Sequence, residues 1–152
     1  MNFSKKLEES FFRQNSFAIY GLGETGKSVI NFLHKKKATN FFIWDDSKKA
    51  RNVCRINKKY KEKHFARILD KIDWIILSPG INILKSKLKK KLIKNKNKII
   101  TDLDLFYVQY PKIKSIVVTG SNGKSTTCKI IENVLKKNNI EVKLGGNIGK
   151  PV

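Results

Sequence analysis

The sequence predicts an α/β protein with a mainly parallel sheet, followed by a second unit that begins in the same way. Short apolar runs typical of strands alternate with segments whose apolar residues recur at helical spacing. Glycine loops directly follow two of the apolar runs. Strands joined through helices pair in parallel by right-handed crossovers, so this alternation indicates one sheet covered by helices.

The predicted strands of the first unit are four apolar runs: Phe17–Tyr20, Phe41–Trp44, Trp74–Leu77 and Ile99–Ile100. Apolar residues at helical spacing predict a helix after the first run, around residues 29–33. We expect an amphipathic lead-in helix over residues 3–12, one helix within the lysine-rich stretch before residue 70, and one or two helical turns at 103–107. Leu84, Leu88 and Leu92 share one helical face, which predicts a helix whose solvated side carries most lysines of residues 85–98.

The pattern starts again after Pro111. A strand is expected within residues 113–119, then a glycine loop, a helix with apolar positions at 130–135, and a strand at Val142 and Leu144. We therefore expect two domains, 1–111 and 112–152. Because the second has only about 40 residues, near the lower limit for an independent core, we expect it to be the truncated start of a larger domain.

Composition excludes several classes of protein. The 152 residues include 33 Lys and Arg against 12 Asp and Glu, a net charge of +21, but 40% are hydrophobic, so a buried core is expected. Only four basic residues are Arg and the lysines spread along the chain, which argues against a dedicated nucleic-acid interface. The longest apolar run, Trp74–Leu77, is too short for a membrane span, and Met1 is followed by no apolar signal segment. The two cysteines match no metal or redox spacing, so a cytoplasmic protein is expected.

The first glycine loop, Gly21–Gly26, fits the pattern G-x-G-x-x-G between a predicted strand and a predicted helix. In a Rossmann-like unit such a loop brings backbone N–H groups and a helix N-terminus to a pyrophosphate. An acidic residue about 20 positions later accepts from ribose hydroxyls, and Asp45 or Asp46 has this place. The pattern predicts nucleotide binding and leaves open whether the ligand is NAD or another nucleoside diphosphate.

The second loop, Gly120–Thr126, reads G-S-N-G-K-S-T and also joins a predicted strand to a helix. Such loops cradle phosphates; Lys124 would reach the β- and γ-phosphates of ATP, and the Ser125 hydroxyl would ligate Mg²⁺. The strict P-loop pattern is not met, because Val118 stands where it requires glycine.

Residues 119–126 resemble the ATP loop of the Mur ligases and folylpolyglutamate synthases. Four further motifs occur in the order and spacing found in D-glutamate-adding Mur ligases: Gly21–Ser28, Trp44–Asp46, Ser78–Ile81 and Gly145–Gly149. Asp104 departs from the pattern, because relatives more often carry Glu there. The resemblance implies a Rossmann-like domain that binds UDP-N-acetylmuramoyl-L-alanine, followed by the first β-loop-α-β unit of a P-loop ATPase-type domain.

The resemblance also implies site residues. The substrate would meet Gly21, Gly23, Glu24, Thr25, Asp45, Asp46, Ser78, Gly80 and Asn147. The ATP loop would comprise Gly120, Ser121, Asn122, Gly123, Lys124, Ser125, Thr126 and Thr127, with Lys124 stabilising charge on the transferred phosphoryl group and Ser125 as the metal ligand.

The implied reaction is ATP- and Mg²⁺-dependent amide formation in peptidoglycan precursor synthesis. The alanyl carboxylate becomes an acyl phosphate, and the amine of D-glutamate displaces the phosphate. We expect a monomer whose partners are these small molecules, and we expect the 152-residue chain alone to be inactive. Two alternatives remain open: a non-catalytic module that binds NAD or UDP, and a basic nucleic-acid-binding protein.

Overall fold

The computed structural model describes residues 10–54 and 62–146. It divides into two compact units, Met1–Gln109 and Tyr110–Val152, which are described separately. The predicted lead-in helix lies largely outside the described residues, but residues 10–14 are helical. Within the described ranges, no helix combines the length and apolar character needed to cross a lipid bilayer.

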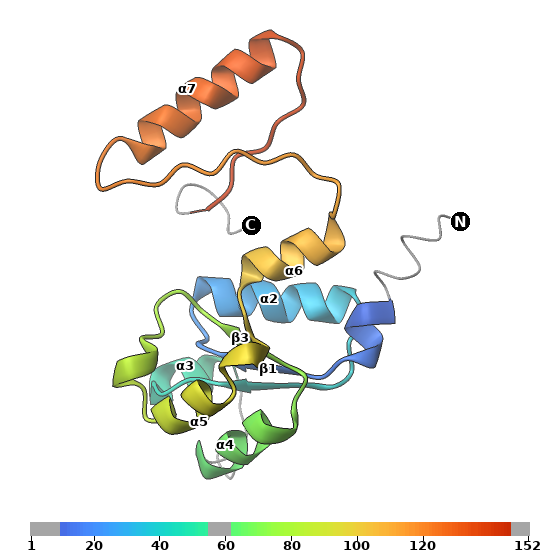
Figure 1. The fold of residues 1–152 in the computed structure, drawn as a ribbon, viewed down its shortest axis with the longest axis vertical. Coiled ribbons are helices and arrows are strands. Elements are labelled where there is room, and N and C mark those ends of the chain that lie inside the picture. Colours follow the sequence, from blue (N-terminus) through green and yellow to red (C-terminus); the bar gives the residue numbers. More distant parts are fainter. Residues whose placement is uncertain (1–9, 55–61, 147–152) are drawn as a thin grey trace. The chain divides into compact units, whose positions relative to one another are not determined.

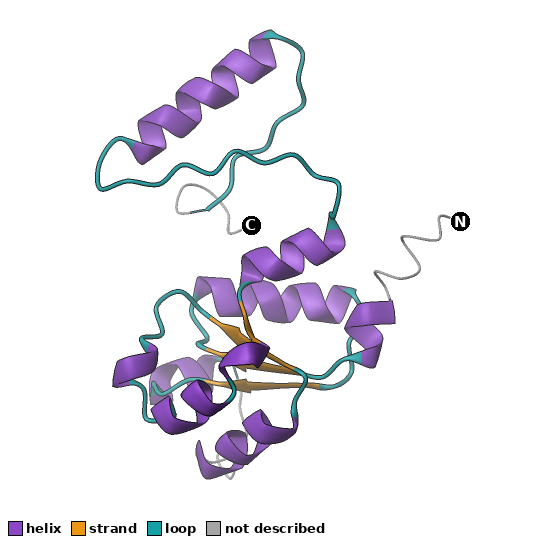
Figure 2. Ribbon diagram, in the orientation of Figure 1, coloured by secondary structure: helices purple, strands orange, loops and turns teal. Residues whose placement is uncertain are grey.

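The first unit contains a four-stranded parallel sheet in the order β2-β1-β3-β4 (Figures 1 and 2). The strands are β1 (Phe17–Tyr20), β2 (Phe41–Trp44), β3 (Trp74–Leu77) and β4 (Ile99–Ile100), as the apolar runs predict. β1 pairs with β2 and β3 over its whole length, from Phe17 opposite Phe41 and Trp74. The predicted α/β class with a parallel sheet is confirmed.

Helices cover both faces of this sheet (Figure 1). On one face α2 (Glu24–Lys35), α6 (Asp102–Gln109) and residues 10–14 enclose a core that includes Phe12, Ile19 and Leu33. On the other face α4 (Glu62–Lys71) and α5 (Lys89–Lys94) pack over a core that includes Tyr20 and Phe65. Alternate residues of β1 therefore serve opposite cores, as expected for a sheet buried on both sides.

The lysine-rich stretch before residue 70 contains two helices, so the expectation of one was wrong. α3 (Lys48–Val53) begins after the turn at residues 45–47 that follows β2, and α4 begins at Glu62. The side chain of Ser47 caps α3 by accepting a hydrogen bond of 3.3 Å from the backbone N–H of Ala50. A serine cap of this kind satisfies an otherwise unpaired N–H group and starts a helix within a polar segment.

The expectation of a single helix carrying Leu84, Leu88 and Leu92 was also wrong. The segment forms a 3-10 turn η1 (Ile83–Lys85), the short helix α5, and a second 3-10 turn η2 (Lys96–Lys98). Leu84 is 68% exposed, whereas Leu88 and Leu92 are buried. Side-chain hydrogen bonds interrupt the helix, because Asn82 accepts from the N–H of Leu84 and Ser86 accepts from the N–H of Leu88.

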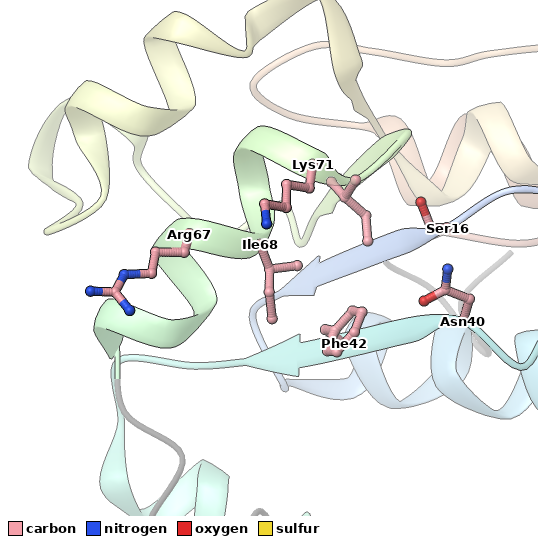
Figure 3. A pocket seen from close by; sticks show the side chains of 7 residues that line it. Ser16, Asn40, Phe42, Arg67, Ile68 and Lys71 are labelled. Atoms are coloured by element: carbon pink, nitrogen blue, oxygen red, sulfur yellow. The ribbon is translucent and has the colours of Figure 1, made fainter.

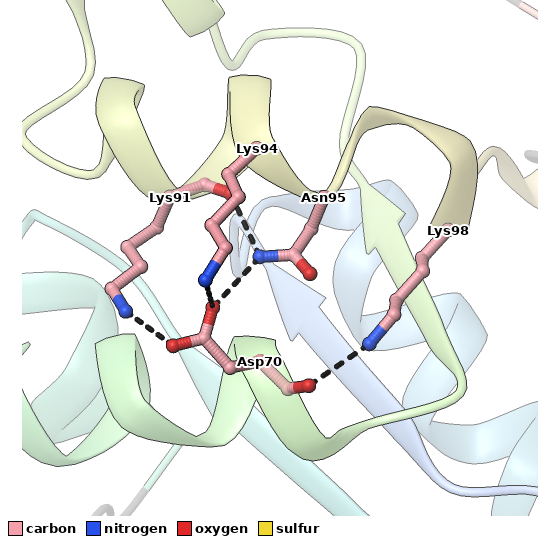
Figure 4. Close-up of polar contacts among 5 residues, drawn as sticks. All are labelled: Asp70, Lys91, Lys94, Asn95 and Lys98. Atoms are coloured by element: carbon pink, nitrogen blue, oxygen red, sulfur yellow. Dashed lines mark hydrogen bonds and ion pairs between the residues drawn. The ribbon is translucent and has the colours of Figure 1, made fainter.

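Three lysines of this segment bind one residue, Asp70, which joins α4 to α5 (Figure 4). Asp70 of α4 forms an ion pair with Lys91 and lies 3.8 Å from the Nζ of Lys94. The Asn95 amide donates to the same carboxylate, and Lys98 donates to the Asp70 carbonyl oxygen. The hydrogen bonds from Lys91 and Asn95 lower the pKa of Asp70 to about 2. These lysines therefore hold the two helices together.

The second unit contains the predicted helix, α7 (Lys124–Lys137), directly after the glycine loop. The strands expected within 113–119 and at 142–144 are not formed, and Ile116 and Val117 are 65% and 79% exposed. An apolar segment becomes a strand only when a neighbouring strand completes its hydrogen bonds. The described part of this unit provides no such neighbour.

Candidate functional site

Three loops leave the carboxyl ends of adjacent parallel strands: Gly21–Gly23 after β1, Asp45–Ser47 after β2 and Ser78–Gly80 after β3. Because the strands are parallel, the loops lie at the same edge of the sheet. The chain passes from β1 to β2 on one side and then to β3 on the other, so this edge is a topological switch point. Open α/β sheets bind ligands at such points.

The three glycines of the first loop have different roles. Gly21 has φ +104°, and a Cβ there would lie 2.7 Å from the Cβ of Ser78. A Cβ on Gly26 would lie 1.9 Å from the carbonyl oxygen of Gly21, so the α2 backbone packs directly on the loop. A Cβ on Gly23 would meet nothing within 4 Å. The fold requires Gly21 and Gly26, whereas Gly23 leaves open space beside the loop.

That open space lies at the N-terminus of α2. Gly23 is the N-cap and offers no side-chain cap. The first N–H groups of a helix have no partner within the helix, and they carry the positive end of its dipole. Of the next two predicted site residues, Glu24 is exposed and Thr25 is half-buried. This end of α2 can therefore bind an anion such as a phosphate.

Asp45 connects the β2 loop to the β1 loop. Its Oδ2 accepts a hydrogen bond of 2.7 Å from the Leu22 N–H, and its Oδ1 accepts one of 2.7 Å from the Ser47 N–H. Both oxygens of a side chain predicted to contact the ligand thus already bind the backbone. The carboxylate orders the first loop before any ligand is bound.

Asp46 connects the end of β2 to Tyr20 of β1. Its carboxylate accepts hydrogen bonds from the Tyr20 hydroxyl, at 2.7 Å, and from the Trp44 indole N–H, at 3.3 Å. The Tyr20 hydroxyl also lies 2.7 Å from the Ser86 Oγ. Burial raises the pKa of Tyr20 far above its usual range, so its hydroxyl keeps its proton and donates to Asp46.

The third loop is tied to the first by Ser78. Its buried hydroxyl donates a hydrogen bond of 2.9 Å to the Gly21 carbonyl oxygen, and its N–H donates to the Tyr20 carbonyl oxygen. Gly80 is exposed, and a Cβ there would meet nothing within 4 Å. The structure therefore brings together eight of the nine predicted substrate residues; Asn147 lies outside the described residues.

Sequence reasoning missed Tyr20, Ser86 and Arg51 at this edge of the sheet. The Arg51 Nη1 donates to the carbonyl oxygens of Asp45 and Asp46, at 2.5 and 3.0 Å. Its guanidinium carbon lies 4.5 Å from the centroid of the Trp44 ring. No local motif marks these residues, because their partners come from other strands or from the end of β2.

A depression of about 250 Å³ lies at the other end of the strands, between α4 and β2 (Figure 3). Ser16 and Asn40, which precede β1 and β2, belong to its lining, and Phe42, Ile68 and Ile72 are its apolar residues. In Figure 3 the Arg67 side chain points away from the other lining residues. This depression is distinct from the predicted site and lacks converging polar groups.

In the second unit, two glycines of the loop before α7 have positive φ angles. Gly120 and Gly123 have φ +145° and +77°. The Lys124 Nζ donates to the carbonyl oxygens of Gly120 and Ser121, which closes the loop around the ammonium group. Ser125, Thr126 and Thr127 are exposed in the first turn of α7. No group of three or more His, Cys, Asp or Glu side chains suited to a metal occurs in the described ranges.

Residues 15–101 match the family described as "Mur ligase MurD-like, N-terminal domain". The chain belongs to the MurD-like Mur ligase family. This match covers the whole four-stranded sheet and all three loops at its carboxyl edge. It confirms the resemblance inferred from the motifs.

Curated relatives carry the name UDP-N-acetylmuramoylalanine–D-glutamate ligase. The chain is 40% identical over 96% of its length to the protein of Wolbachia sp. subsp. Brugia malayi, and 34% identical over 92% to that of Rickettsia bellii. It is 33% identical over 89% of its length to the protein of Aquifex aeolicus. The chain spans about 30% of the length of these relatives.

Proposed function

We propose that this MurD-like chain is part of a ligase that adds D-glutamate to UDP-N-acetylmuramoyl-L-alanine in peptidoglycan precursor synthesis. One observation carries the proposal: three loops meet at the switch point of the sheet, within residues that match the MurD-like N-terminal domain. The names of the curated relatives support the same reaction.

In this proposal the first unit binds the UDP part of the substrate. The open space at Gly23 and the N-terminus of α2 receive the diphosphate, with Glu24 and Thr25 beside it. The Asp45–Asp46 turn faces the uridine, and Ser78–Gly80 borders the site from β3. The hydrogen bonds of Asp45, Asp46 and Ser78 order the three loops before binding, which lowers the entropy that binding costs.

The second unit offers a fitting donor set for ATP and one ligand for Mg²⁺. The positive-φ glycines Gly120 and Gly123 turn the backbone into a loop, and residues 121–127 follow it into α7. Lys124 is held by two carbonyl oxygens and would exchange them for a phosphate oxygen when ATP is bound. The Ser125 hydroxyl is exposed at the helix start, where it can ligate a hard cation.

When bound, ATP supplies the phosphoryl group that activates the alanyl carboxylate, and Mg²⁺ neutralises charge on the phosphates. Lys124 contributes a fixed positive charge beside the transferred group, and the α7 N-terminus orients its oxygens. The first unit holds the substrate by its UDP end. In this role the protein acts as a monomer in the cytoplasm and contributes to cell-wall synthesis and cell division.

Isothermal titration calorimetry with the chain tests this proposal. We expect binding of UDP-N-acetylmuramoyl-L-alanine and of UDP, and no comparable binding of NAD. ATP with Mg²⁺ should bind the chain and should lose affinity in Lys124→Met. Binding of NAD in preference to UDP would favour a dinucleotide module, and tight, salt-dependent binding of duplex DNA would favour a nucleic-acid-binding protein.

A further inference from the structure

Arg51 is held at the carboxyl end of β2 by three contacts. Its Nη1 donates to the carbonyl oxygens of Asp45 and Asp46, at 2.5 and 3.0 Å. Its guanidinium carbon lies 4.5 Å from the centroid of Trp44, which is only 3% exposed. The side chain is half-buried and forms no ion pair with a described residue. Its charge is therefore placed by backbone oxygens and an aromatic ring.

These contacts determine which way the peptide groups of the Asp45–Ser47 turn, after β2, point. In a trans peptide unit the C=O and the following N–H point in opposite directions, and the described chain has no cis peptide bond. With the Asp45 carbonyl turned toward Arg51, the Asp46 N–H points away from it. That N–H makes no hydrogen bond with a described residue, whereas the next N–H, of Ser47, donates to Asp45. Asp46 itself is exposed.

Only a planar, multiply donating cation fits this arrangement. A guanidinium group can stack on an indole ring and donate in its own plane to two carbonyl oxygens. A lysine ammonium group is a compact point charge without a stacking face, so it cannot make all three contacts in the same way. Arg51, on α3, therefore holds two successive peptide units of this turn by their carbonyl oxygens.

We propose that Arg51 is a positioning residue for the base of the bound nucleotide. By fixing the two carbonyl oxygens of the turn, it directs the Asp46 N–H toward the ligand as a donor for a carbonyl oxygen of a pyrimidine base. Arg51 acts through the backbone of Asp45 and Asp46. The inference rests on the proposed binding of a UDP-containing substrate at this edge of the sheet, and it names the group that keeps the base-binding turn in shape.

Calorimetry with UDP and with inorganic pyrophosphate separates the base from the phosphates. We expect Arg51→Gln to weaken UDP binding at least tenfold and to leave pyrophosphate binding within twofold, because the Ser78 hydrogen bond to Gly21 and the N-terminus of α2 do not involve the β2 turn. Arg51→Lys should recover less than half of the lost UDP affinity in logarithmic terms. Arg67→Gln is the matched control, since Arg67 lies on α4 and lines the depression between α4 and β2, so it should change neither affinity.

The outcomes distinguish a failure of the proposed UDP binding from a failure of the role assigned to Arg51. If the unaltered chain does not bind UDP, the proposed function fails, and with it this inference. If the unaltered chain binds UDP and Arg51→Gln binds it equally well, the inference alone is overturned. Equal loss of UDP and pyrophosphate, or full recovery by Arg51→Lys, would also overturn it, because either result assigns Arg51 a general charge effect. If Arg51→Gln does not fold by circular dichroism, the Arg51→Lys result decides.

Discussion

The carboxylate of Asp45 accepts a hydrogen bond of 2.7 Å from the backbone N–H of Leu22 and so fastens the turn after β2 to the glycine loop after β1. Its second oxygen accepts from Ser47. A residue that sequence reasoning assigned to the ligand is thus also the link between two loops that would contact that ligand. Binding and folding are coupled at this position.

Asp45→Asn tests this coupling. The amide keeps one acceptor oxygen, but its NH₂ group then faces a backbone N–H donor, which leaves a hydrogen bond unmade. We expect a loss of about 1–3 kcal/mol in the free energy of unfolding, together with weaker UDP binding. Urea denaturation and calorimetry measure the two effects. Asp102→Asn, at the start of α6, is the control and should cost less than about 1 kcal/mol; equal losses in both variants would contradict the argument.

The glycines of the first loop separate folding from binding. Gly26→Ala places a Cβ 1.9 Å from the Gly21 carbonyl oxygen, so we expect destabilisation by about 3 kcal/mol or more. Gly23→Val meets no protein atom within 4 Å and has an extended backbone that valine adopts readily, so the melting temperature should hardly change. UDP binding should nevertheless be abolished, because the side chain fills the space for the phosphate. Unchanged UDP affinity in Gly23→Val would exclude this loop as the site.

The lowered pKa of Asp70 makes the stability of the first unit depend on pH in the acid range. Hydrogen bonds from Lys91 and Asn95 hold its pKa at about 2 in the folded state, against about 3.9 in an unfolded chain. The stabilisation is complete above the unfolded pKa and disappears as the pH falls from about 4 to about 2, because the unfolded state then binds more protons.

Asp70→Asn should therefore be less stable at neutral pH and should show a shallower loss of stability between pH 4 and pH 2. Urea midpoints measured across this range for both proteins check the expectation. The variant should keep the part of the pH-dependent loss of stability that Asp73 causes, because hydrogen bonds from Ser16 also lower the pKa of Asp73. Parallel pH profiles for the two proteins would show that Asp70 does not contribute.

Glu24 places a negative charge in the first turn of α2, where the proposed diphosphate binds. Repulsion between this exposed carboxylate and a bound anion opposes binding. We expect Glu24→Gln to raise UDP affinity about two- to fivefold, the usual size of a single charge effect at a helix end. The gain should shrink at high ionic strength, where exposed charges are screened. A loss of affinity in the variant would instead mean that the Glu24 carboxylate accepts a hydrogen bond from the ligand.

The four strands could be predicted from the sequence, residue by residue, because each is a short apolar run buried on both faces or at a sheet edge. The first glycine loop, Gly21–Gly26, could also be predicted, because three glycines at this spacing between a strand and a helix have few other physical explanations. The helix expected over residues 85–98 was not, because Asn82 and Ser86 make hydrogen bonds that periodicity does not report. The strand expected at Ile116–Val118 did not form, because a strand needs a paired neighbour.

By itself, the sequence determined the parallel α/β class, the order of the motifs and the family. Only the tertiary structure decided that Asp45 and Asp46 serve as links between loops, and that Tyr20, Ser86 and Arg51 complete those links. The physical reason is the distance along the chain over which each kind of interaction acts. Strand and helix preferences act between residues near each other in the chain, whereas Tyr20 and Ser86 are 66 positions apart and meet only when parallel strands bring their carboxyl ends to one edge.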